Sequence, residues 1–127
     1  MKSRVIILFV MLAVLVGTVV WEQVYIDNTV SKLQNLSNDL YTNLEQENLT
    51  ESKALANEVH NYWNERQTVI TLMLDFRDVE QIGRQSSYII SYLDDEDFEL
   101  ARSECQQFIH LLENFGNMTH FDIHNVL

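Results

Sequence analysis

The sequence predicts an all-α protein, with an N-terminal transmembrane helix followed by an extracytoplasmic antiparallel bundle of three to four helices. Residues 5–21, VIILFVMLAVLVGTVVW, carry no charge. Beyond them apolar residues recur at steps of three and four, which is the spacing of amphipathic helices. The 127 residues include no proline and three glycines, a composition that argues against a turn-rich β protein.

The apolar stretch at residues 5–21 has the composition of a membrane anchor. At about 1.5 Å per residue it makes roughly 26 Å of helix, a little less than a hydrocarbon core of roughly 30 Å. Lys2 and Arg4 precede it, and Trp21 and Tyr25 lie at its other end. We expect these side chains at the two membrane interfaces. The basic flank predicts a single-pass protein of the cell membrane, with its N-terminus in the cytoplasm and its C-terminal domain outside.

A cleaved signal peptide is the alternative interpretation of residues 1–21. The residues where a signal peptidase would cut, such as Leu15 with Gly17, do not form a pair of small side chains. We therefore expect a retained anchor at residues 1–21 and a helical domain at residues 22–127.

The domain beyond the anchor is strongly acidic. All 19 acidic residues of the chain lie there, and the formal net charge of the chain is −11. Nucleic acid is therefore not an expected partner, and neither is anionic lipid. The single cysteine, Cys105, rules out an intramolecular disulfide framework, and its place on an apolar helix face predicts a buried thiol.

Two helices are expected directly after the anchor. The first, at about residues 22–47, carries an apolar face made of Ile26, Val30, Leu33, Leu40 and Leu44. Asn48 and Glu51 have the spacing of a capping box, which predicts a second helix at about residues 50–75.

The heptad pattern is interrupted after the second helix. The step of three from Phe76 to Val79 follows another step of three, and such a stammer predicts a kink or short turn between about Asp75 and Asp78. The alternative is a straight helix that splays away from its neighbour. A third helix is expected at about residues 78–93.

A run of four carboxylates at residues 94–97 marks the next boundary, because carboxylates are favourable at a helix N-terminus and unfavourable at a C-terminus. A fourth helix is expected at about residues 97–115, with Gly116 as its left-handed C-terminal cap. Residues 117–127 are too apolar to stay free in water, so we expect this tail to dock on the bundle.

The candidate metal ligands of the chain are His120, Asp122 and His124. Two histidines four positions apart share one face if the tail is helical. No further ligand accompanies them in the sequence, so no metal or cofactor is predicted. The carboxylates at residues 94–97 lack the spacing of a calcium-binding loop, and a solvated helix cap explains them.

The sequence holds no local signature of a catalytic nucleophile and no glycine-rich phosphate loop, so we expect no enzymatic activity. The main hypothesis is a membrane-anchored interaction or scaffold module that binds a protein partner or a second copy of itself. The alternative is a ligand- or metal-binding sensor bundle that acts through a membrane partner. A dry core with an exposed apolar patch would favour the scaffold, and a polar, solvent-accessible cavity between helices would favour the sensor.

Three parts of the chain carry a resemblance to a known family. They are Trp63 ahead of an apolar helix, DFELARSE at residues 97–104 and the ending FDIHNVL at residues 121–127. With them the chain resembles a family of short single-pass membrane proteins from spore-forming bacteria, classified only as a domain of unknown function. Phe76 departs from the family, in which a polar residue, commonly histidine, is expected. The resemblance implies a bacterial origin and a membrane address, and it brings no known activity.

Overall fold

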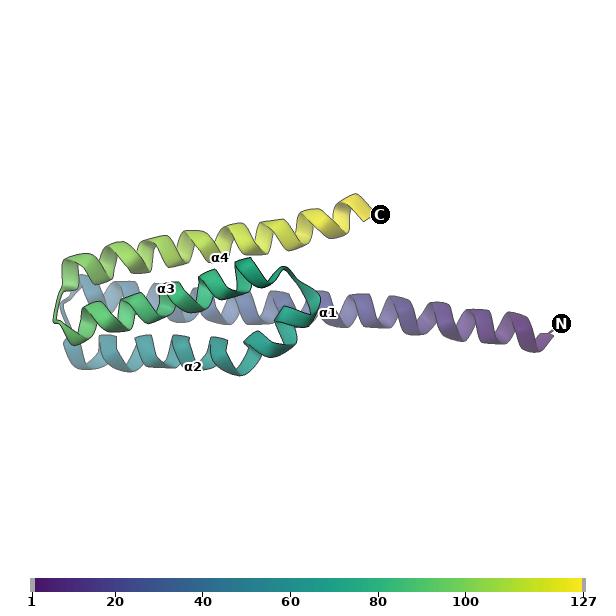
Figure 1. Cartoon of the computed structure of the whole chain (residues 1–127), viewed down its shortest axis with the longest axis horizontal. Coiled ribbons are helices and arrows are strands. Elements are labelled where there is room, and N and C mark those ends of the chain that lie inside the picture. Colours follow the sequence, from purple (N-terminus) through teal and green to yellow (C-terminus); the bar gives the residue numbers. More distant parts are fainter. Residues whose placement is uncertain (1, 127) are drawn as a thin grey trace.

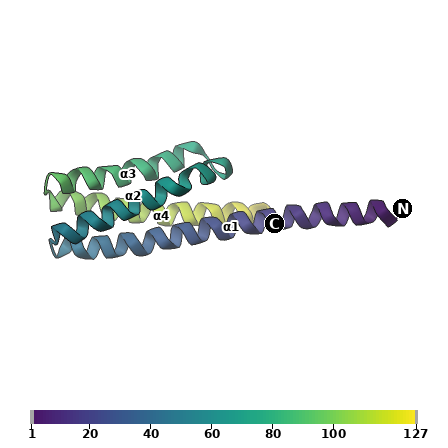
Figure 2. The ribbon, with the colours of Figure 1, turned by 90° about the horizontal axis from the view of Figure 1, so that it is seen from below.

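The computed structural model describes residues 2–126, and for residues 117–126 it describes the backbone alone. The described chain is four α-helices without strands, so the all-α prediction is confirmed. The helices are α1 (Lys2–Glu45), α2 (Leu49–Met73), α3 (Phe76–Asp94) and α4 (Phe98–Val126). They run up and down in an antiparallel bundle in which α1 and α3 each pack against α2 and α4 (Figures 1 and 2).

The predicted membrane anchor and the first predicted helix of the bundle form one continuous helix, α1. Its N-terminal half projects alone from the bundle (Figure 1), and its large apolar side chains from Val5 to Trp21 are all exposed. By length and composition, this half of α1 is apolar enough to cross a membrane. The C-terminal half of α1 is amphipathic and contributes Leu33, Leu40 and Leu44 to the bundle core.

The break between α2 and α3 lies at Leu74 and Asp75, beside the predicted stammer. Leu74 has an extended backbone (φ −132°, ψ 172°), which ends α2. Asp75 then caps α3, because its carboxylate accepts a hydrogen bond of 3.0 Å from the Arg77 N–H. This backbone hydrogen bond, and the nearby charge of Arg77, lower the pKa of Asp75.

The predicted end of the fourth helix is wrong. α4 continues through Gly116 to Val126, and no glycine among the described residues has a positive φ. A Cβ atom on Gly116 would lie 3.5 Å from Cγ1 of Val30, so this glycine marks a close approach between α4 and α1 instead of a helix cap. Whether the tail side chains dock lies outside the described residues, but the helix itself runs back along α1 past the α2–α3 turn (Figures 1 and 2).

Two helical hairpins with the same turn build the bundle. The α1–α2 turn has a positive φ at Glu47 (55°), and the α3–α4 turn has one at Glu96 (58°), 49 positions later. The backbone hydrogen bonds repeat at the same interval: the Asn48 N–H donates to the Asn43 carbonyl (3.0 Å), and the Asp97 N–H donates to the Tyr92 carbonyl (2.9 Å). Both are Schellman-type closures in which glutamate takes the left-handed position.

The buried residues of the two hairpins correspond at this same interval of 49. The matching pairs are Val30 with Val79, Leu33 with Ile82, Ser37 with Ser86, Leu40 with Ile89, Leu44 with Leu93, Ala56 with Cys105, Val59 with Phe108 and Trp63 with Leu112. The hairpins are therefore related by a pseudo-twofold axis along the bundle, which exchanges α1 with α3 and α2 with α4. Equivalent residues of α1 and α3 consequently lie at the same height along the bundle.

Candidate functional site

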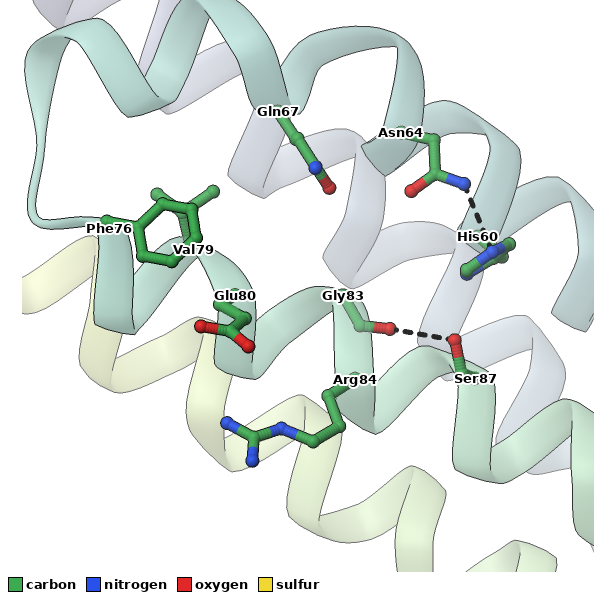
Figure 3. A pocket seen from close by; sticks show the side chains of 9 residues that line it. All are labelled: His60, Asn64, Gln67, Phe76, Val79, Glu80, Gly83, Arg84 and Ser87. Carbon is green, nitrogen blue, oxygen red and sulfur yellow. Dashed lines mark hydrogen bonds between the residues drawn. The ribbon is translucent and has the colours of Figure 1, made fainter.

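An open groove of about 380 Å³ runs along the outside of the bundle between α2 and α3 (Figure 3). The side chains that α2 contributes are polar, whereas those that α3 contributes include apolar, polar and charged ones. The lining residues are His60, Asn64 and Gln67 of α2, and Phe76, Val79, Glu80, Gly83, Arg84 and Ser87 of α3. The groove thus offers hydrogen-bond donors, acceptors and both signs of charge around a short apolar segment.

Gly83 opens this groove because it has no side chain to fill it. A Cβ atom at this position would lie 3.4 Å from Nε1 of Trp63 and 3.6 Å from Oε1 of Gln67. The Trp63 ring is fully buried behind this point, and its indole N–H has no hydrogen-bond partner in the described structure. A buried donor without an acceptor is costly, so the Trp63 N–H beneath the groove is an unfavourable feature of the core.

Hydrogen bonds among three side chains, those of His60, Asn64 and Ser86, hold one end of the groove in place. The Ser86 hydroxyl donates to the Gly83 carbonyl (2.7 Å), so its oxygen is left to accept from Nδ1 of His60 (2.9 Å). Nε2 of His60 then accepts from the Asn64 amide (3.0 Å; Figure 3). The bond between His60 and Ser86 ties α2 to α3 across the groove.

The opposite face of the bundle lacks these features. The pseudo-twofold axis relates the α2–α3 groove to the face between α4 and α1, where Gln34 occupies the position of Gly83 and Ile109 occupies that of His60. Both of these replacements are half-buried, and so are the two residues they replace. Gly83 lies against the large Trp63 ring, whose equivalent in the second hairpin is the smaller Leu112, so the glycine accommodates this ring. The histidine is the further difference between the two faces.

Replacing Gly83 with alanine is expected to raise the free energy of unfolding by about 0.5–1 kcal/mol, because alanine is the better helix former. The added methyl group would meet the Trp63 ring at an ordinary contact distance of 3.4 Å. Denaturant unfolding of the full-length protein in mild detergent, followed by circular dichroism, measures the change. A loss of stability would mean that the groove floor has no room for a methyl group.

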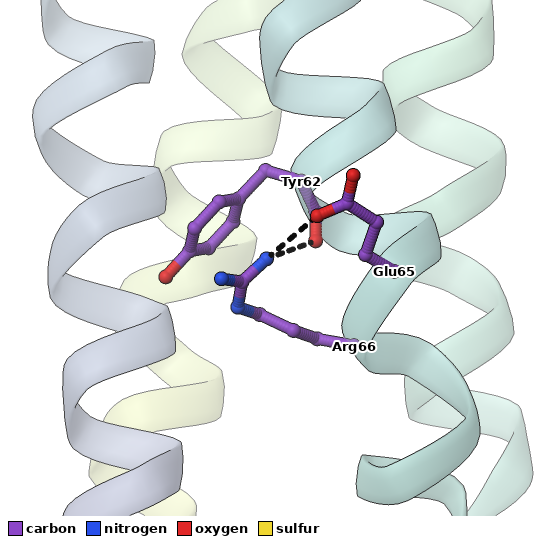
Figure 4. Close-up of polar contacts among 3 residues, drawn as sticks. All are labelled: Tyr62, Glu65 and Arg66. Atoms are coloured by element: carbon purple, nitrogen blue, oxygen red, sulfur yellow. Dashed lines mark hydrogen bonds and ion pairs between the residues drawn. The ribbon is translucent and has the colours of Figure 1, made fainter.

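Arg66 interrupts the apolar face of α2 without leaving an unpaired charge. Its guanidinium group stacks on the Tyr62 ring, 3.5 Å from the ring centroid, and donates to the Tyr62 carbonyl (3.1 Å; Figure 4). The Glu65 carboxylate accepts a further hydrogen bond of 3.4 Å from the Arg66 guanidinium group. The equivalent residue of the second hairpin is the buried Phe115, whose ring packs edge-on against Trp63 at 6.3 Å. The two hairpins therefore differ in polarity near the α2–α3 turn.

The residues predicted for the membrane interfaces lie along one half of α1. Lys2 and Arg4 are exposed in its first turn. Trp21 and Tyr25 stack on each other, with ring centroids 5.5 Å apart, where α1 enters the bundle. An aromatic pair at this position is typical of a membrane–water interface.

The candidate metal ligands lie in the C-terminal part of α4. The side chains of His120, Asp122 and His124 lie outside the described residues. Among side chains 2–116, no three His, Cys, Asp or Glu residues form a group that could hold a metal ion. In the acidic run, the Asp97 carboxylate accepts from the Leu100 N–H (3.1 Å), which is the bond of a helix cap.

Cys105 is fully buried, as its place on the apolar face predicts. Its thiol donates to the Ser37 carbonyl (3.5 Å), and burial raises the pKa of the thiol to about 12. A thiol in this state is neither a nucleophile nor a metal ligand at neutral pH, so Cys105 belongs to the core.

The raised pKa of Cys105 predicts a loss of stability in alkali. The unfolded thiol ionises near its ordinary pKa of about 9, whereas the folded thiol keeps its proton up to about 12. The contribution of the protonated Cys105 thiol to the free energy of unfolding is therefore fully present below about pH 9. Above this pH the free energy of unfolding falls by about 1.4 kcal/mol per pH unit. Unfolding titrations between pH 7 and 11 should show this fall in the native protein and a smaller one in Cys105→Ala, which copies the equivalent Ala56. Equal slopes would contradict the raised pKa.

The fold defines the class of protein. It is a four-helix bundle of two repeated hairpins, and its first helix, α1, extends beyond the bundle as a long apolar segment. The chain belongs to the family described as Domain of unknown function (DUF4363), which matches residues 20–126. The match covers the bundle and leaves out most of the apolar stretch. No curated protein and no solved structure matches the chain.

Proposed function

We propose that the protein is a membrane-anchored, extracytoplasmic interaction module without catalytic activity. In this proposal α1 crosses the cell membrane with Lys2 and Arg4 on the cytoplasmic side, and the bundle stands outside. The basic residues that flank the N-terminal end of the apolar stretch support this orientation.

The observation that carries the proposal is the difference between the two equivalent faces of the bundle. At equivalent positions the α2–α3 face has Gly83 and the His60–Ser86 bond, whereas the α4–α1 face has Gln34 and Ile109. The exposed Glu80 and Arg84 on its rim can pair with opposite charges of a partner, and an open groove of this shape suits a polar segment of another protein.

The sensor hypothesis has one observation in its favour. The groove volume of about 380 Å³ falls within the range of small-molecule sites, which is roughly 300–1,000 Å³. Against it, the groove lies on the outside of the bundle, and the space between the helices is filled by packed leucine, isoleucine, valine and aromatic side chains. We therefore prefer a protein partner.

Site-specific photocrosslinking in intact cells tests the proposal. A photoreactive amino acid is placed at Glu80 or Arg84 on the groove rim and, as matched controls, at Ser31 or Asn35, the equivalent exposed positions of α1. We expect the same crosslinked protein from both rim positions and none from the controls. Two differently tagged copies of the chain distinguish self-association from a different partner.

Two outcomes would contradict this function. Equal crosslinking from all four positions would mean that the groove has no special role. The absence of any rim crosslink, together with a rise in melting temperature on adding a small molecule that Gly83→Ala abolishes, would favour the sensor hypothesis.

A further inference from the structure

Two large apolar side chains are exposed at the turn between α2 and α3. Leu72, next to the last residue of α2, has 85% of its surface exposed, and Phe76, the first residue of α3, has 60% exposed. Their neighbours Met73 and Leu74 pack partly against the core. The core therefore does not cover Leu72, and Phe76 borders the end of the α2–α3 groove with most of its ring exposed. Together they place two large exposed apolar side chains at one end of the bundle.

The pseudo-twofold axis gives the height of this turn relative to the anchor. Leu74, Asp75 and Phe76 are equivalent to positions 25–27 of α1, so they lie only about four to six residues beyond Trp21. At about 1.5 Å per residue this is roughly 6–9 Å. Figures 1 and 2 show the turn beside the point where α1 leaves the bundle.

This distance matches the depth of the interfacial layer of a bilayer. The headgroup regions add roughly 5–8 Å on each side of a hydrocarbon core of about 30 Å. If α1 spans the core up to Trp21, the α2–α3 turn reaches the headgroups, where Trp21 and Tyr25 also lie. Side chains of leucine and phenylalanine are favourable there.

The charge at the turn also suits a membrane surface. The bundle as a whole is acidic, but at the turn the Asp75 carboxylate pairs with the Arg77 guanidinium at 3.5 Å. This pair is neutral overall, so it adds no net charge at the tip of the turn, and the next acid along the chain is Asp78 in the first turn of α3. A second copy of the chain, anchored in the same membrane, would stand beside the bundle and not beneath this end.

We propose that Leu72 and Phe76 insert into the interfacial layer of the same membrane that α1 crosses. The bundle then has two attachments to the bilayer, the α1 helix and the α2–α3 turn, and together they fix its tilt and the direction in which the groove opens. The inference rests on the membrane anchoring in the proposed function.

Spin labelling of the full-length protein in phosphatidylcholine liposomes tests the insertion. A nitroxide is attached at Leu72→Cys, at Leu100→Cys as an exposed leucine near the far α3–α4 turn, and at Val14→Cys inside the anchor; the buried Cys105 does not react. Frequent collisions of the nitroxide with oxygen indicate that it lies in lipid, and frequent collisions with a water-soluble nickel chelate indicate that it lies in water. We expect an oxygen-to-nickel ratio at position 72 several-fold higher than at position 100 and lower than at position 14.

The three labels separate the failure of the insertion from the failure of the anchoring. A ratio at position 72 equal to that at position 100, with position 14 in lipid, would overturn the insertion and leave the anchor intact. Water exposure at position 14 would overturn both. Protection of position 72 from both reagents, with spin–spin broadening that disappears on dilution with unlabelled protein, would assign the turn to a second copy and also overturn the insertion.

Discussion

Replacing Trp63 with alanine is expected to lower the free energy of unfolding by about 3–5 kcal/mol, a large part of the stability of a small domain. Trp63 is fully buried, packs edge-on against Phe115 and lies behind Gly83, so its removal leaves a cavity where three helices meet. Denaturant unfolding of the full-length protein in mild detergent, followed by circular dichroism, gives the difference.

Trp63→Phe is the matched control for this substitution. Phenylalanine keeps an aromatic ring against Phe115 and removes an indole N–H that has no partner, so part of the lost packing energy is recovered. We expect a loss well below that of Trp63→Ala. Equal losses in the two variants would show that the core does not depend on the ring.

Two arginines in the apolar half of α1 are expected to release the protein from the membrane. Each charge near the centre of a transmembrane helix costs about 2.5–3.5 kcal/mol on insertion, so Leu12→Arg together with Val16→Arg adds about 5–7 kcal/mol. The double variant should lose its resistance to carbonate extraction from membranes.

The matched control places the same charges on the part of α1 that lies in the bundle. Ser31→Arg together with Asn35→Arg changes two exposed positions and should leave the protein in the membrane fraction. If the Leu12→Arg, Val16→Arg variant also stays in that fraction, α1 is not the anchor.

Helical periodicity predicted most of the fold, because each bundle helix has one apolar face and local caps. The Asn48 side chain does accept from the Glu51 N–H (3.3 Å), as the capping-box spacing indicates. The end of α4 could not be obtained in this way. A glycine such as Gly116 has the same appearance in a sequence whether it caps a helix or allows a close approach to Val30, and only the packing of α1 on α4 distinguishes the two.

The groove could not be predicted because it depends on how α2 and α3 face each other. His60 and Ser86 are 26 positions apart, and neither belongs to a recognisable motif. Gly83 inside an amphipathic helix was the one local signal. The hairpin repeat also leaves little trace in the sequence: Val30, Ser37 and Leu44 are identical to Val79, Ser86 and Leu93, but the other buried pairs differ in their side chains.

Labelling of intact cells with a membrane-impermeant maleimide tests the central claim, that α1 holds the bundle outside the cytoplasm. Cysteine replaces Asp95 in the exposed far turn of the bundle, or Ser3 ahead of the apolar stretch, while the buried Cys105 remains unreactive. The account predicts that Asp95→Cys reacts without permeabilisation and that Ser3→Cys reacts only after it. The reverse pattern, or reaction of Asp95→Cys only in permeabilised cells, would contradict it.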